Sequence, residues 1–408
     1  MTQADARAVF ALIRAALTDT AQPPEETVDW EAVFSVAAAH GVENLLCAGA
    51  TRCGLPADLP ALQTLTVQAQ RYVLTAGRQD YWFGKVCAAL ETAGVDYLPL
   101  KGSVVRPLYP QPDWRAMGDL DILIREEQYD RIVPAMQAAG LTATTESDHE
   151  LNWRTEQGNL LVELHKRIVP SYNKDFYAVF GTGWERAIPA GQPDAPHRYR
   201  LSDEDTYLFL FTHFAMHYRD KGIGLRHPVD LWVYRRAYPS MDGAYIAAQL
   251  EKLHLTAFHD NVMRTLAVWM EGAASDAVTD RITRTVLNSG QYGLYDNHLL
   301  SDSLKQGRLV SFKTARAKRI RMMLFTPYKP MCALYPFLEK APVLLPVMWV
   351  YHWFDVLINR REHISRRNAE RKMLTVDAIR AYEESLRAVG LDYFFDRDDG
   401  DRKDEEHE

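Results

Sequence analysis

The sequence predicts an α+β fold in which a small mixed sheet lies between an N-terminal helical segment and a helical C-terminal domain. Helical periodicity, with apolar residues three and four positions apart, dominates residues 1–93. Residues 94–168 instead alternate short extended runs with helical runs. From Asp203 onward almost every segment is again periodic as a helix. These observations place the sheet in the first half of the chain, between two helical regions.

Length and composition set the domain organisation. The chain of 408 residues is too long for a single ordinary core, so we expect about two to three domains. An apolar fraction of 47% and a charged fraction of 25% are typical of a globular protein. We expect a helical segment over 1–93, an α/β module over 94–200, a helical domain over 201–394 and a disordered acidic tail over 395–408, since 396–408 contains no apolar residue.

Within the module, the pattern predicts a strand at Tyr97–Leu100, a turn at Gly102 and a helix that Ser103 caps and that runs to Leu108. Four further strands and one helix follow. We expect the strands at 119–124, 141–145, 151–155 and 160–165, and the helix at 126–139.

Charge and cysteine content exclude several classes of protein. The net charge of −7 argues against bulk coating of nucleic acid. The four cysteines form no CxxC pair, so we expect free thiols in a reducing compartment and no zinc site. The N-terminus is typical of an amphipathic helix rather than a signal peptide. We therefore expect a cytoplasmic protein.

Two acidic residues are the first candidates for chemistry. Asp119 and Asp121 lie two positions apart on a predicted strand, so both carboxylates project from one face. Their mutual repulsion is relieved by a divalent ion, and Mg²⁺ or Mn²⁺ is commonly held by one or two carboxylates together with substrate phosphates. The alternative is an acidic strand end that simply faces water.

The turn before this strand is a candidate for binding phosphate. Lys101, Gly102 and Ser103 end one predicted strand and open a helix, where free backbone amides and the helix dipole favour an anion. Gly102 allows close approach, Ser103 can donate a hydrogen bond, and Lys101 adds a mobile positive charge. A turn with no ligand is the simpler alternative.

A third acidic residue would complete a cage for two metal ions. In the run 160–165, alternation places Leu161, Glu163 and His165 on one face of a strand. Glu163 is the candidate, with a surface acid on the strand as the alternative.

Together these residues carry a family resemblance. The segment LKGSVVRPLYPQPDWRAMGDLDILI resembles the signature of the bacterial uncharacterised nucleotidyltransferase family, which combines Lys-Gly, Tyr-Pro, an Arg and Asp-hydrophobic-Asp. The run VELHKRI looks like its third-acid strand. Weaker similarity extends to His40-Gly41-Val42, to the helix with His213 and to Val343-Leu-Leu-Pro346.

The family in turn resembles the polymerase-β-like nucleotidyltransferases. This resemblance implies that Gly102 and Ser103 form the phosphate-binding turn and that Asp119, Asp121 and Glu163 hold two metal ions. The implied reaction moves a nucleoside monophosphate from a nucleoside triphosphate to a hydroxyl and releases pyrophosphate. Fifteen residues separate Ser103 from Asp119, slightly more than the wider superfamily usually has.

Three more residues are candidates for binding the nucleotide. Arg115 could neutralise charge on the triphosphate, although a surface arginine in a loop is an equal alternative. The stretch from Arg226 to Leu231 is similar to an Arg-x-x-x-Asp-Leu stretch of abortive-infection toxin nucleotidyltransferases. Arg226 or Asp230 would then close the cleft from the helical side, or Asp230 would only pair locally.

Two other features have structural alternatives that we favour. His213 and His217 lie four apart on one helical face, but no third metal ligand has a suitable spacing, so we expect core or surface histidines. Residues 341–372 combine aromatic and basic residues and are a candidate for peripheral membrane contact. An amphipathic helix with packed aromatics is the favoured alternative there, and Pro346, His352 and Asp355 argue against a membrane-spanning helix.

The sequence thus favours a metal-dependent nucleotidyltransferase with a nucleoside triphosphate as donor. The acceptor stays open between a small molecule, a peptide and tRNA, because acceptor choice depends on pocket shape. Two alternatives remain, a toxin-like enzyme that modifies tRNA or protein and a non-catalytic module that only binds a nucleotide or a partner.

Overall fold

The computed structural model describes residues 1–24, 27–158, 160–291, 293–294, 297–298, 300–301, 325–359 and 375–393. The chain divides into two compact units. Unit 1 comprises Met1–Leu294 and Ala388–Phe394, and unit 2 comprises Tyr295–Arg387 and Phe395–Glu408. The predicted acidic tail and the part of 341–372 that begins at residue 360 lie outside the described residues.

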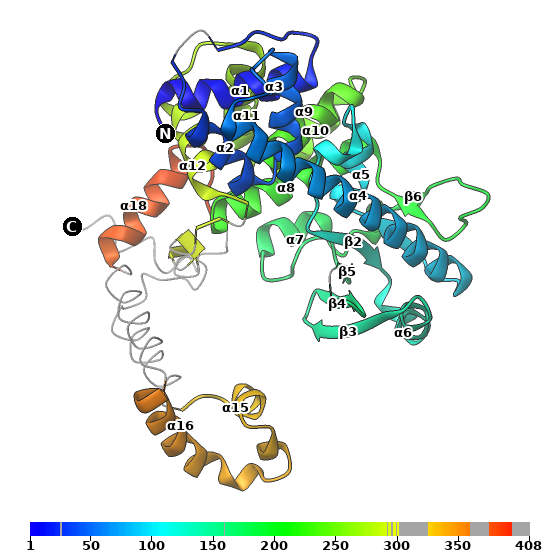
Figure 1. The fold of residues 1–408 in the computed structure, drawn as a ribbon. Coiled ribbons are helices and arrows are strands. Elements are labelled where there is room, and N and C mark those ends of the chain that lie inside the picture. Colours follow the sequence, from blue (N-terminus) through cyan, green and yellow to red (C-terminus); the bar gives the residue numbers. More distant parts are fainter. Residues whose placement is uncertain are drawn as a thin grey trace. The chain divides into compact units, whose positions relative to one another are not determined.

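Four helices begin unit 1 (Figure 1). They are α1 (Gln3–Leu17), α2 (Trp30–His40), α3 (Glu43–Arg52) and the 33-residue α4 (Pro60–Thr92). Local signals in the sequence define their ends. Thr2 and Asp5 form a capping box at the start of α1, and Asp29 caps α2. Gly41, in the left-handed conformation at φ 64°, ends α2.

A five-stranded mixed sheet follows, as the sequence predicts. Its strands lie in the order β1 (Tyr97–Pro99), β2 (Asp119–Ile124), β5 (Leu161–His165), β4 (Glu150–Thr155) and β3 (Leu141–Glu146). Strands β2 and β5 are parallel, whereas the other neighbouring pairs are antiparallel.

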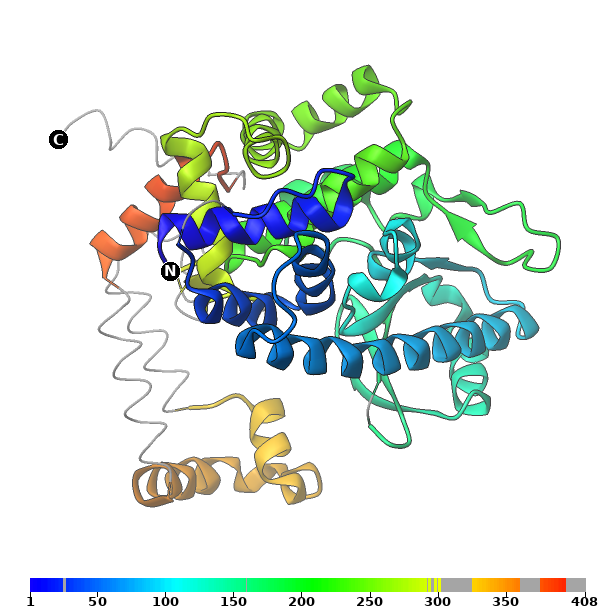
Figure 2. The same ribbon diagram turned by 45° about the horizontal axis from the view of Figure 1, so that its top comes forward.

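One face of this sheet is the core of the module. Alternate residues of the central strands, among them Leu120, Ile122, Val162 and Leu164, are buried together with residues of α4 and of α6 (Tyr129–Ala138). In Figure 2 the long α4 runs alongside the sheet. The residues between them, including Asp119, Asp121 and Glu163, project from the opposite face.

The predicted helix after Gly102 differs from expectation. Helix α5 covers only Gly102–Val105, and a 3₁₀ turn over Arg106–Leu108 follows, since Pro107 has no N–H to continue an α-helix. The N-cap residue is Lys101, and no side chain caps the helix. The prediction that Ser103 caps it is therefore wrong, because the N-cap position lies two residues earlier, at Lys101.

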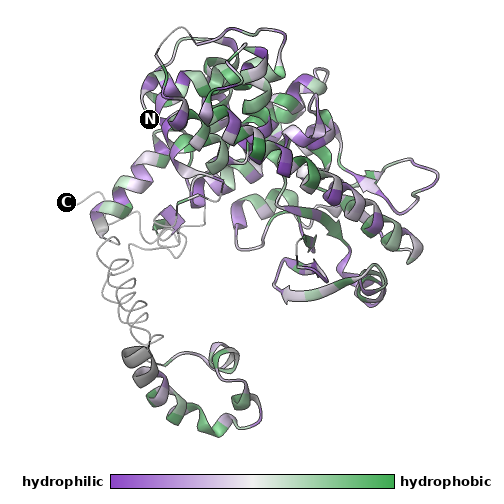
Figure 3. Ribbon diagram, in the orientation of Figure 1, coloured by the Kyte–Doolittle hydropathy of each residue, from purple (hydrophilic) through white to green (hydrophobic). Residues whose placement is uncertain are grey.

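Short elements connect the sheet to the second helical part of unit 1. After α7 (Lys174–Phe180) and the two-stranded β6–β7 sheet (Ile188–Pro189 and Tyr199–Arg200), the chain enters a series of helices. They are α8 (Asp203–Asp220), α9 (Arg226–Ala237), α10 (Gly243–Lys252), α11 (Thr256–Glu271) and α12 (Ala277–Ser289). Green and purple residues mix along these helices in Figure 3, as expected for elements with one buried face.

In unit 2 the described helices are α15 (Tyr328–Leu334), α16 (Leu345–Asn359) and α18 (Val376–Arg387), with 3₁₀ turns at Pro336–Glu339 and Pro342–Leu344. Met331, Cys332 and Leu338 form a small core on which Met348 and Trp349 pack. Val347, Val350 and Tyr351 of α16 are exposed. Across the described ranges, every helix is too short or too polar to cross a membrane. Membrane contact through 341–372 stays a prediction.

The close packing of α1 on α3 yields a stability prediction. A Cβ atom at Gly49 would overlap the backbone of Leu12, whereas one at Gly77, inside α4, would meet nothing. We expect Gly49→Ala to lower the free energy of unfolding by about 1–3 kcal/mol through overpacking. Gly77→Ala, the matched control, should raise it by about 0.5–1 kcal/mol, because alanine favours helix. Urea denaturation measures both, and an unchanged midpoint for Gly49→Ala would contradict the packing.

Candidate active site

The pairing of β2 with β5 brings acidic residues together on the open face of the sheet. In this parallel register Asp121 lies opposite Glu163, and Asp119 lies opposite Leu161. His165 follows two residues after Glu163 and therefore shares its face. One atom each from Asp121, Glu163 and His165 lies within 4.8 Å of the other two, which is close enough for them to share a metal ion.

Asp121 is the most heavily bonded residue of this cluster. Its side chain is 5% exposed, and its Oδ1 accepts hydrogen bonds from Lys101 Nζ at 2.6 Å and from His165 Nε2 at 2.8 Å. His165 Nε2 also lies 3.6 Å from Glu163 Oε2. A lysine from the turn and a histidine from β5 thus meet on one carboxylate oxygen.

The three carboxylates have very different electrostatic environments. Burial by itself raises the pKa of Asp121, but the charge of Lys101 and the hydrogen bond from His165 outweigh it and hold that pKa well below its ordinary value. The charge of Asp121 and burial together raise the pKa of Asp119. Burial, with Asp119 and Asp121 nearby, raises the pKa of Glu163 to about 8. Repulsion within the cluster therefore favours a cation.

The turn beside the cluster has an unusual backbone. Lys101 has φ 46° and ψ −113°, a region that favours glycine. Gly102 is buried, and a Cβ atom there would overlap the guanidinium of Arg115 and the sulfur of Met117. Close packing against these two side chains thus accounts for the glycine. Within the described part of the chain, the buried Ser103 Oγ has no hydrogen-bond partner.

Arg115 and Asp230 lie close together, and they form an ion pair with each other. Arg115 Nη2 lies 2.7 Å from Asp230 Oδ2, and both side chains are buried. Tyr109 Oη donates to Asp230 Oδ1 at 2.8 Å. Burial favours the neutral guanidine, yet the charge of Asp230 more than offsets this and raises the pKa of Arg115. These residues join the module to α9.

Arg226, at the start of α9, interacts electrostatically with Asp119 of the acidic cluster. Its Nη1 donates to the carbonyl oxygen of Ala116 at 3.0 Å, and its buried Nε has no partner among the described residues. Burial and the neighbouring Arg115 lower the pKa of Arg226, while the charge of Asp119 acts in the opposite direction. Its charge therefore lies within electrostatic reach of the Asp119 carboxylate.

A histidine group forms the helical wall beside the site. The rings of His213 and His217, from α8, have centroids 4.4 Å apart, and the ring of His227 from α9 lies 5.6 Å and 6.4 Å from them. Burial holds the pKa of His213 and of His227 well below the ordinary value. Because Lys101 and Arg226 are also nearby, this group is a poor place for a metal cation.

Sequence reasoning missed His165 and His227 as members of the site. Strand alternation already places His165 on the face of Glu163, so its position could have been used. His227 adjoins Arg226 in the sequence, but its approach to His213 depends on how α8 and α9 pack.

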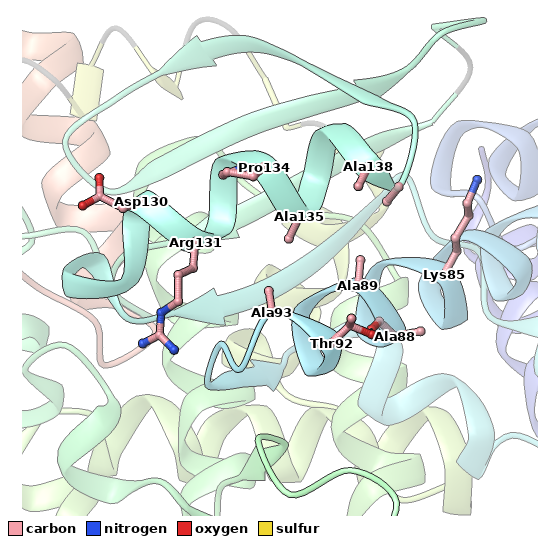
Figure 4. A pocket seen from close by; sticks show the side chains of 11 residues that line it. Lys85, Ala88, Ala89, Thr92, Ala93, Asp130, Arg131, Pro134, Ala135 and Ala138 are labelled. Atoms are coloured by element: carbon pink, nitrogen blue, oxygen red, sulfur yellow. The ribbon is translucent and has the colours of Figure 1, made fainter.

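A separate pocket of about 620 Å³ lies between α4 and α6. Ala88, Ala89, Ala135 and Ala138 line much of it, with Lys85 and Arg131 at its sides (Figure 4). None of the candidate catalytic or nucleotide-binding residues lines this pocket.

The raised pKa of Glu163 gives a prediction for metal binding. At pH 7 a carboxyl with a pKa of about 8 is mostly protonated, and a metal ion binds its deprotonated form. Binding of Mn²⁺ at pH 7 should therefore release close to one proton, and affinity should rise up to about tenfold per pH unit below pH 8. Calorimetry in buffers of different ionisation enthalpy measures the released proton. Glu163→Gln should abolish the release, and a wild-type protein that binds Mn²⁺ without it would contradict the prediction.

A comparison with known protein families gives a match for this chain. Residues 26–271, more than half of the chain, match the family model described as uncharacterised nucleotidyltransferase. No curated protein and no solved structure matches the chain. The match spans the turn, both strands with the acidic residues and the start of α9. The chain therefore belongs to the uncharacterised nucleotidyltransferase family.

Proposed function

We propose that the protein is a metal-dependent nucleotidyltransferase that moves a nucleoside monophosphate from a nucleoside triphosphate to a hydroxyl of an acceptor. The observation that carries this proposal is the buried cluster of Asp121, Glu163 and His165 beside the Lys101 turn. Asp119 adds a third carboxylate from the same face of β2.

The residues fit a hard divalent ion. Asp119, Asp121 and Glu163 offer carboxylate oxygens, which Mg²⁺ and Mn²⁺ prefer, and they would hold one or two such ions. When bound, the metal neutralises phosphate charge and lowers the pKa of the attacking hydroxyl. Ser103 Oγ and Arg226 Nε, which have no hydrogen-bond partner in the part of the chain that the structure describes, supply donors of the kind that a triphosphate needs.

Each residue then has a role in the proposed reaction. Lys101, Ser103 and Arg226 bind the triphosphate, with Gly102 allowing the turn to pack closely. Arg115 and Asp230 hold α9, and hence Arg226, against the module through their ion pair. The acceptor oxygen attacks the α-phosphorus, the bond to the bridging oxygen breaks, and pyrophosphate leaves. Glu163 accepts the proton of the hydroxyl.

The variant Glu163→Gln tests this assignment and separates an enzyme from a non-catalytic binding module. We expect triphosphate affinity in Mg²⁺ to fall less than about threefold, because Asp119 and Asp121 would still hold a metal ion for the phosphates. Pyrophosphate release should fall by about 10²–10⁴-fold, because the group that accepts the proton is lost. Calorimetry gives the affinity, and a coupled assay with lysate-derived acceptors gives the release. Glu146→Gln, the same change on β3, is the matched control and should behave as wild type.

Two outcomes would contradict the proposed reaction. Full turnover in Glu163→Gln would remove Glu163 from the catalytic group. A wild-type protein that binds triphosphate but releases no pyrophosphate with any acceptor would favour the binding module. Incorporation of labelled nucleotide into tRNA or protein, rather than into small molecules, would favour the toxin-like alternative.

A further inference from the structure

Lys101 keeps a side chain at a position where the backbone favours glycine. Among the described residues only Lys101 and His254 combine a side chain with a positive φ, and Lys101 has φ 46°. This conformation is strained for any residue with a Cβ atom. A contact of the lysine side chain must offset the strain, and within the described ranges the side chain donates a hydrogen bond to Asp121.

The ammonium of Lys101 contacts the acidic cluster through Asp121. Its Nζ donates to Asp121 Oδ1 at 2.6 Å, and its side chain is 18% exposed. Burial by itself lowers the pKa of Lys101, but the charges of Asp121 and Asp119 outweigh it and raise that pKa. The ammonium is therefore a stable internal cation.

A divalent ion and this ammonium need the same oxygen. Mg²⁺ lies about 2.0–2.1 Å from a ligand oxygen, and Asp121 Oδ1 already accepts hydrogen bonds from Lys101 and from His165. An ion placed there would repel an ammonium that stayed at hydrogen-bond distance. The lysine stem has four flexible carbons, so the ammonium can leave the carboxylate without a change of the backbone.

We propose that Lys101 exchanges partners, from Asp121 to the phosphates, when metal and nucleoside triphosphate bind. This inference rests on the proposed function and adds that the binding of metal and the binding of nucleotide are coupled. Metal alone competes with an internal cation and binds weakly. Metal that arrives with a triphosphate offers the ammonium a new anion, so metal and nucleotide bind cooperatively. Ser103, two residues away, and Arg226 have the unpartnered donors that would share those phosphates.

The test measures Mn²⁺ binding without nucleotide. By calorimetry, Lys101→Met should bind Mn²⁺ about tenfold or more tightly than wild type, because the competing charge is gone. Affinity for ATP in the presence of Mn²⁺ should fall. Lys85→Met, the same charge change on α4 at the core side of the sheet, is the matched control and should bind Mn²⁺ as wild type does. Equal or weaker Mn²⁺ binding by Lys101→Met overturns the proposal.

Two further measurements keep the result interpretable. Lys101→Gly relieves the positive φ and should show the same tighter Mn²⁺ binding if Lys101→Met does not fold. In the wild type, mass spectrometry after amine labelling should find Lys101 more reactive in saturating Mn²⁺ alone, and protected again when ATP is added. Unchanged reactivity in Mn²⁺ means that the lysine does not leave, and it also overturns the exchange.

These readouts separate the exchange from the proposed function, because neither requires nucleotidyl transfer. If Mn²⁺ binding tightens in Lys101→Met but the wild type releases no pyrophosphate with any acceptor, only the proposed transfer reaction is contradicted. If transfer occurs and Mn²⁺ binding is unaffected by Lys101, only the exchange fails.

Discussion

The parallel pairing of β2 with β5 is the constraint on which the rest of the site depends. Its register sets Asp121 opposite Glu163 and gives His165 the same face, while the intervening residues anchor the sheet on α4 and α6. A slip of β5 by one residue would turn Glu163 and His165 toward the core. The apolar face of the sheet therefore fixes the geometry of the polar face.

A second constraint joins the module to the helices that face it. Arg115 and Tyr109, from the segment before β2, both bind Asp230 of α9 in a buried contact. Removing one partner of such a pair would leave a buried charge unpaired. The contact holds the start of α9, and with it Arg226 and His227, close to the turn and the acidic strand. The ion pair thus keeps Arg226 beside the segment that leads into β2.

The sequence predicts those features that depend on local pattern. Alternation along β2 and β5 predicts which carboxylates share a face, and the mixed sheet with α4 follows from periodicity. Contacts between distant segments could not be predicted in this way. Alternation does not reveal that Lys101 reaches Asp121, that Arg115 is held by Asp230, or that α8 and α9 bring His213 and His227 together. These depend on side-chain direction and helix packing, which one sequence does not specify.

Nucleotide binding should depend on metal if Asp119, Asp121 and Glu163 hold a divalent ion. The acidic cluster should repel a triphosphate until a divalent cation lies between them. Calorimetric titration with ATP, GTP, CTP and UTP, each in Mg²⁺ and in EDTA, measures this dependence. At least one triphosphate should bind in Mg²⁺, and its binding should be lost in EDTA. Equal affinity in the two conditions would contradict a metal site formed by Asp119, Asp121 and Glu163.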